Sequence, residues 1–308
     1  MKGAVLYGPR DVRFEERDDP TIIEPTDAII RVSASCVCGS DLWPYRGIEM
    51  YPGPQPMGHE YCGIVEEVGS AVRHIKRGQF VVGSFFASDN TCSICRAGYQ
   101  GRCVQAQPIG ALGAQAPFLR VPLADGTLVA TPAPPSDDLI PSLLAASDVL
   151  GTGWFAADAA AAGPGKTVAV VGDGAVGLLG VLAAKQMGAE RIILMSRHEV
   201  RQKLGLEAVG TQESMMQAIR ATRPGGHVGF VGVSHGVELP GLELFFAQVN
   251  LLGGPAPVRR YLPELIDLIW KGQINPGKVF DLALPLEQVA EGYRAMDERR
   301  AIKTLLTV

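Results

Sequence analysis

The stretch Thr167-Val-Ala-Val-Val-Gly-Asp-Gly-Ala-Val-Gly177 decides the fold of the second half of the chain. Its β-branched run predicts a buried strand, and the three glycines that follow form a G-x-G-x-x-G pattern. The first glycine permits a tight turn, the second lets backbone approach a pyrophosphate, and the third lets a helix pack closely. A strand-to-helix turn without a ligand is the alternative. The strand-like run before the glycines and the helix-like stretch after them favour a dinucleotide site. Its predicted residues are Gly172, Gly174, Ala175, Val176 and Gly177.

The segments around this motif continue the same pattern. A helix-like stretch, Leu178–Gly188, leads into a second apolar run, Arg191–Met195, and another buried strand is expected within Gly226–Gly232. Strand, glycine turn, helix and strand make a βαβ unit, which implies a parallel sheet covered by helices. We therefore expect an α/β fold in which residues 151–269 form a doubly wound, Rossmann-type cofactor-binding domain.

The end of the second apolar run indicates which nicotinamide cofactor is used. NAD sites usually place an acidic residue there to bind the ribose hydroxyls. This strand is instead followed by Ser196 and Arg197, and the first acidic residue is Glu199. A hydroxyl and a guanidinium can bind a 2′-phosphate, which a carboxylate would repel. We predict a preference for NADP(H), with a solvated arginine as the alternative interpretation.

The first half of the chain has a different sequence pattern, typical of short strands and turns. Short β-branched runs, such as Ala28–Val32, Gly63–Val68 and Gln79–Val82, alternate with Gly, Pro and Asp. Regular short strands with turn residues between them predict a β-barrel. Residues 1–150, joined by the C-terminal segment 270–308, are expected to form this second domain.

Two groups of residues in the barrel domain have the chemistry of metal ligands. Cys38 and His59 offer a thiolate and an imidazole, and Asp148 is the best candidate for a third ligand; catalytic zinc typically has three. A buried cysteine and a hydrogen-bonded histidine without metal are the alternative. A compact lobe supplies four further candidates, which suit a closed structural zinc site: Asp89, Cys92, Cys95 and Cys103. For this lobe the alternative is three reduced cysteines without metal, and a disulfide is less favoured inside a cell.

The composition of the chain argues against a nucleic-acid-binding, membrane-spanning or secreted protein. The chain has 308 residues, of which 47% are hydrophobic and 19% charged, with a formal net charge of −4. This balance gives no electrostatic reason to expect nucleic acid or an acidic membrane as a partner. No apolar run approaches the ~18 residues of a membrane span, and the N-terminus has no secretory pattern. We expect a cytoplasmic protein, in which six cysteines confined to the first third indicate metal binding.

Taken together, these motifs resemble the zinc-dependent medium-chain alcohol dehydrogenases, and the resemblance covers nearly the whole chain. The residues that carry it are Cys38–Asp41, Gly58–Glu60, Asp89–Cys103, Gly172–Gly177 and Ile302–Lys303. The resemblance implies a GroES-like barrel, a Rossmann domain, a small alcohol or carbonyl substrate, and a homodimer or homotetramer.

The resemblance also implies roles for individual residues. Cys38, His59 and Asp148 would hold a catalytic zinc that polarises the substrate oxygen. Glu60 would be a nearby carboxylate able to enter the coordination sphere, and Ser40 would begin a proton relay. Lys303 would contact a cofactor phosphate. The lobe would hold a structural zinc, with Asp89 departing from the four-cysteine pattern. From the residues alone, and not from the resemblance, Asp41 either orients a metal ligand or forms a turn after Gly39.

One departure from the family concerns length. The shortfall falls around Glu207 and Ala208, where a strand, a helix and most of another strand are missing. Strand 4 of a doubly wound sheet lies beside strand 1, so its loss leaves unpaired backbone groups in mid-sheet. We hypothesise that a segment is absent from the sequence at this join, with a true deletion as the less favoured alternative. A Cα separation far above ~3.8 Å across the join would distinguish the two.

Two other functions remain open. A zinc-free medium-chain relative that binds NADPH, either a reductase or a non-catalytic protein, is the main alternative, and metal analysis discriminates it. A redox sensor built on the cysteine lobe is less favoured, because it leaves the glycine motif unexplained.

Overall fold

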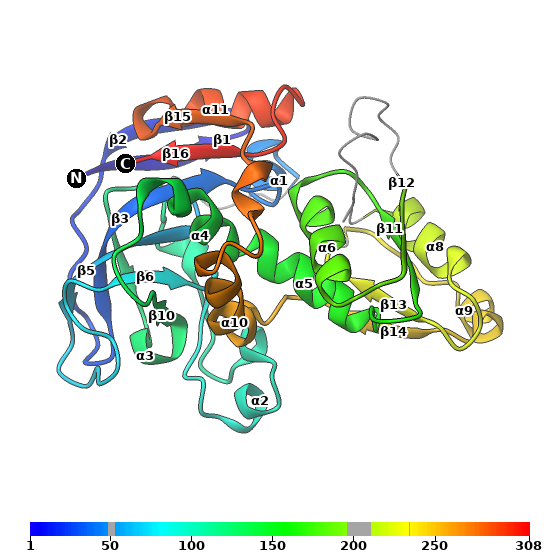
Figure 1. Cartoon of the computed structure of the whole chain (residues 1–308). Helices are drawn as coiled ribbons and strands as arrows, with labels where there is room; N and C mark the ends of the chain where they lie inside the picture. The colour runs from blue at the N-terminus through cyan, green and yellow to red at the C-terminus, as the bar shows by residue number, and fades with distance from the viewer. Residues whose placement is uncertain (49–52, 196–210, 234) are drawn as a thin grey trace. The chain divides into compact units, whose positions relative to one another are not determined.

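The computed structural model describes residues 1–48, 53–195, 211–233 and 235–308, and divides them between two compact units (Figure 1). The first unit comprises Met1–Asp148 with Val258–Val308, and the second comprises Val149–Pro257. The sequence predicts that the chain returns to the first unit at residue 270. In the structure it returns earlier, at Val258. The reason is helix α10 (Val258–Trp270), whose buried apolar face contacts α4 and β10 of the barrel unit.

The first unit is built on two main sheets and the short antiparallel pair β7-β8. Its larger sheet runs β10-β6-β5-β3-β16-β15, with β9 also paired to β3, and its smaller sheet runs β2-β1-β4. The strands are β1 (Lys2–Gly8), β2 (Asp11–Glu16), β3 (Ala28–Val37), β4 (Gln55–Pro56), β5 (Tyr61–Val68), β6 (Phe80–Gly83), β7 (Phe86–Ala87), β8 (Gln107–Pro108), β9 (Phe118–Val121), β10 (Leu128–Ala130), β15 (Leu282–Pro285) and β16 (Thr304–Thr307). The helices are α1 (Leu42–Tyr45), α2 (Ser93–Arg96), α3 (Ala124–Thr127), α4 (Ile140–Ala146), α10 and α11 (Val289–Asp297).

Strand β3 is the centre of this unit. It pairs antiparallel with β5, β9 and β16, so the C-terminal strand lies beside the strand that leads to Cys38. Its inward side chains, such as Ile30 and Val32, join Val65 and Leu119 in one apolar core. Helix α11 contacts β15 and β16 (Figure 1). The predicted β-rich GroES-like domain is confirmed, and the C-terminus is integral to it.

The second unit contains the expected βαβ sequence. Strand β11 (Thr167–Val171) pairs in parallel with β12 (Arg191–Met195), and α6 (Ala175–Gln186) connects them. Strand β13 (His227–Phe230) pairs in parallel with β14 (Asn250–Gly253). The remaining helices are α5 (Val149–Ala159), α8 (Gln212–Ala221) and α9 (Gly241–Ala247).

The parallel, Rossmann-type character is confirmed, but the continuous sheet is not. Within the described residues, the four strands form two separate pairs, β11-β12 and β13-β14. A doubly wound sheet places a further strand beside its first strand, which here is β11. Among the described residues no strand occupies that position. The join at Glu207 and Ala208 lies outside the described residues, as do Ser196 and Arg197.

No single helix among the described residues is long and apolar enough to cross a bilayer. One bent pair, residues 137–146 and 149–159, meets the criterion only when the two helices are taken together.

Asp125 ties helix α3 to the loop between β5 and β6, and this gives a first prediction. Its carboxylate accepts backbone hydrogen bonds from Arg73, His74 and Ile75, at 2.7, 2.8 and 3.1 Å. Burial alone would raise the pKa of Asp125, but these three N–H groups lower it overall. Asp125→Ala should therefore cost about 1–2 kcal/mol of unfolding free energy near pH 7.

The pH dependence follows from the sign of this shift. A carboxyl group whose pKa is lower in the folded state stabilises the fold above its unfolded pKa of ~3.9, and this contribution disappears as pH falls through the folded pKa. Urea unfolding should show the gap between wild type and Asp125→Ala narrowing below about pH 4, whereas the exposed Asp138→Ala control should show no gap. A gap that persists in acid would contradict this account.

Candidate functional site

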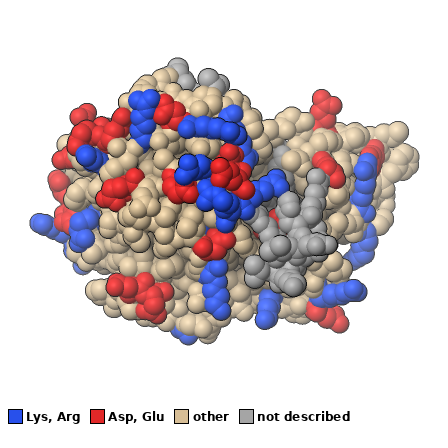
Figure 2. Space-filling model, turned by 90° about the horizontal axis from the view of Figure 1, so that it is seen from above, with Lys and Arg blue, Asp and Glu red and all other residues tan. Residues whose placement is uncertain are grey.

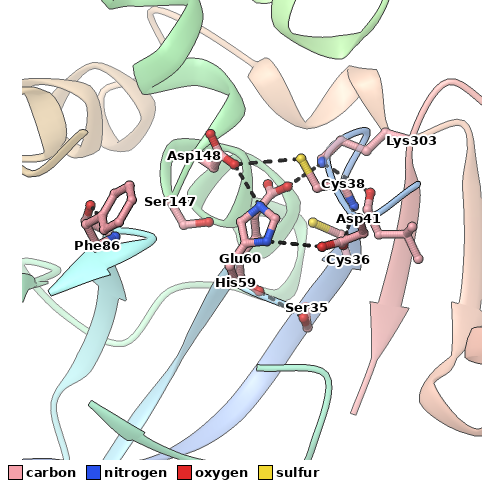
Figure 3. Close-up of polar contacts among 12 residues, drawn as sticks. Ser35, Cys36, Cys38, Asp41, His59, Glu60, Phe86, Ser147, Asp148 and Lys303 are labelled. Atoms are coloured by element: carbon pink, nitrogen blue, oxygen red, sulfur yellow. Dashed lines mark hydrogen bonds and ion pairs between the residues drawn. The ribbon is translucent and has the colours of Figure 1, made fainter. Parts of the chain in front are cut away.

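His59 is placed by an unusual turn. Gly58 has φ = +94°, and a Cβ at this position would lie 2.5 Å from Cγ of Gln115. Only glycine fits both the left-handed backbone and the close approach. The turn directs the His59 ring between two carboxylates: Nδ1 lies 3.2 Å from Asp41 Oδ1, and Nε2 lies 3.1 Å from Asp148 Oδ2 (Figure 3).

Cys38 follows the last residue of β3 and is buried. Its backbone N–H donates to Asp41 Oδ2 at 2.9 Å, so Asp41 holds both the turn and the His59 ring. The two roles weighed for Asp41 are therefore both present. The Cys38 Sγ atom lies 3.8 Å from Asp148 Oδ2. A thiol, an imidazole and a carboxylate from three distant segments thus converge in the first unit.

These side chains form a group that could hold a metal ion. Candidate ligand atoms of Cys38, His59, Glu60 and Asp148 all lie within 4.8 Å of one another. Burial alone lowers the pKa of His59, but Asp41, Cys38 and Asp148 raise it well above its ordinary value. The group therefore favours a positive charge at its centre, which a divalent cation would supply in place of a proton.

Glu60 adds a further observation that fits a metal. Its Oε1 atom accepts a 2.6 Å hydrogen bond from Lys303 Nζ, and the two side chains are 0% and 1% exposed. Its Oε2 atom is buried and has no hydrogen-bond partner among the described residues. A buried carboxylate oxygen without a partner costs folding free energy, so we expect Oε2 of Glu60 to bind a ligand. A metal ion bound beside His59 would satisfy it.

Lys303 therefore has a different environment from the one expected. The resemblance implied contact with a cofactor phosphate, but the ammonium group is buried against Glu60 and also donates to the Val37 carbonyl at 3.3 Å. Burial alone lowers the pKa of Lys303, yet neighbouring Cys36, Glu60 and Cys38 raise it well above its ordinary value. The physical reason is strand pairing: β16 lies beside β3, and Lys303, directly before β16, forms an ion pair with the buried Glu60.

Gln115 is a supporting residue that the sequence did not reveal. It is fully buried, its Nε2 atom donates to the Cys36 carbonyl at 3.0 Å, and it lies 3.5 Å from Asp41 Oδ2. Its Oε1 atom accepts a hydrogen bond from Tyr293. Gln115 lies in the stretch Gly113–Pro117, which carries no motif, so its role arises from tertiary contacts alone. Ser40 lies half-buried in the turn before α1, and its proton-relay role remains a prediction.

The second group lies in the loop between β7 and β8. Candidate ligand atoms of Asp89, Cys92, Cys95 and Cys103 also lie within 4.8 Å of one another. All six cysteines of the chain are free. Backbone N–H groups of Asp89 and Gln105 each lie 3.4 Å from Cys103 Sγ, and that of Cys95 lies 3.4 Å from Cys92 Sγ. Such N–H···S contacts stabilise thiolates, the form in which cysteine binds metal.

The carboxylate of Asp89 is held in a charge state and orientation that suit a fourth metal ligand beside the three cysteines. Its Oδ1 atom accepts from the N–H groups of Thr91 and Cys92, at 2.8 and 2.9 Å. Burial alone would raise the pKa of Asp89, but these two hydrogen bonds, together with those to the Cys95 and Cys103 thiols, lower it to about 2. The carboxylate is thus held ionised and oriented. Backbone N–H groups of Val104 and Cys95 likewise lower the pKa of Cys92.

The glycine motif forms the expected turn in the second unit. Gly172 has φ = +106°, and Gly174 precedes the first residue of α6. A Cβ on Gly174 would meet no atom of the described residues within 4 Å, so among them the space beside this glycine is open. Gly174 is the N-cap of this 12-residue helix and provides no side-chain cap, and the first N–H groups of a helix have no acceptor within it. This is the cradle that a pyrophosphate requires.

Fold and site together define a two-unit class of protein: a GroES-like barrel carrying two metal-ligand groups, joined to a Rossmann-type unit. Comparison with known proteins gives the same result, since residues 24–133 match the alcohol dehydrogenase GroES-like domain. The chain is 30% identical to zinc-type alcohol dehydrogenase B of Aspergillus flavus over 349 aligned residues, covering 99% of this chain and 81% of the relative.

Two further similarities agree. The chain is 33% identical to "Probable zinc-binding alcohol dehydrogenase Rv1895" of Mycobacterium tuberculosis, covering 95% of this chain and 84% of the relative. The structure superimposes on alcohol dehydrogenase TADH from Thermus sp. ATN1 with a TM-score of 0.91 and 28% identity, covering 100% of both chains. The chain belongs to the zinc-type alcohol dehydrogenases of the medium-chain family.

Proposed function

We propose that the chain is an NADP(H)-linked, zinc-dependent dehydrogenase that interconverts alcohols with aldehydes or ketones. The observation that carries the proposal is the convergence of Cys38, His59, Glu60 and Asp148, together with the unpartnered Oε2 atom of Glu60. Zinc, when bound there, supplies Lewis acidity that lowers the pKa of an alcohol, and NADP(H) exchanges hydride with the substrate carbon.

The chain's own residues would prepare this chemistry. Asp41 holds Nδ1 of His59, so that Nε2 is directed at the ligand group. Lys303 compensates the charge of Glu60, which limits the surplus negative charge left after Cys38 and Asp148 offset a divalent ion. The Ser40 hydroxyl, two residues from Cys38, would carry the alcohol proton towards solvent. Asp89, Cys92, Cys95 and Cys103 would hold a second, structural zinc.

The NADP(H) preference is supported by sequence chemistry at the end of β12. Ser196 and Arg197 stand where a ribose-binding carboxylate would be expected. Activity of zinc-replete protein towards a panel of primary and secondary alcohols and aldehydes, measured with each cofactor, tests this. We expect kcat/KM to be at least about tenfold higher with NADPH than with NADH, and Arg197→Asp to reverse the order. A clear NADH preference in the unmodified chain would refute the assignment.

The competing zinc-free reductase is separated by metal analysis. Two zinc ions per chain would favour the dehydrogenase, whereas protein purified without zinc and active without it would favour the reductase.

Figure 2 shows acidic and basic side chains interspersed over one face, in keeping with the small-molecule partner that we propose. We also propose a cytoplasmic location, as expected from the sequence, and a homo-oligomer. Exposed apolar side chains of α9 support the oligomer: Leu242, Phe245 and Phe246 are 74%, 73% and 71% exposed. Sedimentation equilibrium tests the oligomer.

A further inference from the structure

Tyr293 and Gln115 are two buried polar residues that the proposed chemistry does not use. Tyr293 lies on α11 and Gln115 lies in the segment before β9, and both are 0% exposed. The Tyr293 hydroxyl donates a hydrogen bond to Gln115 Oε1 at 3.1 Å. Burying a polar group costs free energy unless it is hydrogen-bonded, so each residue offsets part of the burial cost of the other.

Helix α11 brings Tyr293 to Gln115 because it packs close to the sheet. A Cβ on Gly292 would lie only 3.1 Å from Cγ2 of Thr304 on β16, so a side chain at this position would be crowded. The next residue, Tyr293, belongs to an apolar cluster, and its ring centroid lies 5.3 Å from that of Tyr45. Packing therefore fixes the ring, and its hydroxyl is directed at the amide of Gln115.

The orientation of the Gln115 amide follows from its three neighbours. Its Oε1 atom accepts from Tyr293, and its Nε2 atom faces two acceptors. Nε2 donates to the carbonyl of Cys36, two residues before Cys38, at 3.0 Å and lies 3.5 Å from Asp41 Oδ2. A reversed amide would set its oxygen against a carbonyl and a carboxylate, both of which only accept hydrogen bonds. The amide therefore has one favourable orientation.

Gln115 also contacts the turn that presents His59. Its backbone N–H donates to the Met57 carbonyl at 3.0 Å, and the neighbouring Ala114 N–H donates to the Gly58 carbonyl at 2.8 Å. The Gln115 side chain lies against this turn, because a Cβ on Gly58 would be 2.5 Å from its Cγ. Gln115 thus joins the end of β3 to the segment that leads into His59.

We propose that Gln115 is a positioning residue for the metal-ligand group: with its amide fixed by Tyr293, it restrains Asp41 and so raises the affinity of the group for zinc. Asp41 is the link, since Oδ2 lies on the Gln115 side and Oδ1 lies 3.2 Å from His59 Nδ1 (Figure 3). A carboxylate held in this place keeps a proton on Nδ1, so that Nε2 offers its lone pair to a metal. The inference rests on the zinc site proposed above.

The expected change in zinc affinity is moderate, because neither residue is a metal ligand. Gln115→Met keeps a side chain of similar length but removes both polar atoms that fix Asp41 and the end of β3. Loss of partners outside the ligand set typically costs about 10- to 100-fold in metal affinity, and we expect about tenfold here. Tyr293→Phe leaves the Gln115 amide in place without its donor, and should weaken zinc binding about threefold to tenfold.

Competition between the full 308-residue chain and a chromophoric zinc chelator measures both metal sites in one titration. His59→Ala shows which step of the titration belongs to the His59 site. The lobe of Asp89 and three cysteines is the internal reference, because the described hydrogen bonds of Gln115 include none of its members. Gln115→Met and Tyr293→Phe should weaken only the His59 step. Unchanged affinity, or equal weakening at both sites, would overturn the proposal.

Tyr45→Phe is the matched control, because it also removes one phenol hydroxyl from the cluster around Tyr293. Its hydroxyl takes no part in the described hydrogen bonds of Gln115, so zinc affinity should stay unchanged. Circular dichroism verifies folding of every variant. The double variant Tyr293→Phe with Gln115→Met should bind zinc as Gln115→Met does, since the hydroxyl acts through the amide. Additive losses would contradict that order of contacts and overturn the proposal.

The same titration separates this inference from the proposed function. If the unmodified chain binds zinc at the His59 site and Gln115→Met binds it equally well, the zinc chemistry stands and the positioning role is wrong. If His59→Ala binds as many zinc ions as the unmodified chain, the metal site itself is refuted, and the role of Gln115 is refuted with it.

Discussion

Replacing His59 by alanine is expected to remove one zinc ion per chain and to lower kcat/KM for alcohol oxidation by at least ~10³-fold. The magnitude follows because Lewis acidity contributes several kcal/mol of transition-state stabilisation, and each ~1.4 kcal/mol is a factor of ten. His59 is central to the ligand group, since its Nε2 atom lies 3.1 Å from Asp148 and its Nδ1 atom 3.2 Å from Asp41. Removing the ring also leaves two carboxylates without their shared partner.

The measurement combines zinc analysis by mass spectrometry with steady-state kinetics. His74→Ala is the matched control, because this exposed histidine lies on the same barrel outside both ligand groups. It should retain two zinc ions and full activity. Asp41→Asn should fall between the two, since it keeps the size of the residue that orients His59 but weakens its hold; a loss of about 10- to 100-fold is expected. Full zinc content in His59→Ala would contradict the assignment.

The elements that the sequence predicted well are those whose order is local. The run Thr167–Val171 became β11 with the expected bounds, because β-branched residues favour a strand and glycines end it. Strands β4, β7 and β8 were not predicted, since each has two residues and exists only through pairing with a distant partner. Helix α10 was recognised but assigned to the wrong unit, because a periodic apolar face does not show what will cover it.

The site divides in the same way. Cys38, His59 and Asp148 could be proposed because thiolate, imidazole and carboxylate are recognisable zinc ligands in family motifs, and the structure brings them together. The pairing of Glu60 with Lys303 joins residues 243 positions apart and depends on β16 lying beside β3. No spacing rule anticipates such a contact. The same applies to Gln115, whose amide acts only through the fold around it.

The second large effect concerns the cysteine lobe, where Cys95→Ala or a strong chelator is expected to unfold residues 89–106 locally. This lobe buries little apolar surface: Val104, Tyr99 and Ile94 are 67%, 42% and 36% exposed, and its one α-helix has four residues. A helix of this length is not stable alone in water. Four ligand atoms converge within 4.8 Å, so we expect a bound zinc to supply much of the order of this lobe; a structural zinc can contribute ~10 kcal/mol or more in small domains.

Limited proteolysis reports on this local unfolding directly, because Arg96 and Arg102 are exposed trypsin sites inside the lobe. Cleavage follows the population of the open state, so a loss of only ~1.4 kcal/mol of local stability should accelerate cutting at these two sites about tenfold. Cys62→Ala is the matched control: its thiol is fully buried on β5 and belongs to neither ligand group, so it should lower overall stability through its cavity while zinc content and lobe cleavage stay unchanged. Cleavage rates that chelation does not alter would mean that backbone N–H···S contacts, and not a metal, order the lobe.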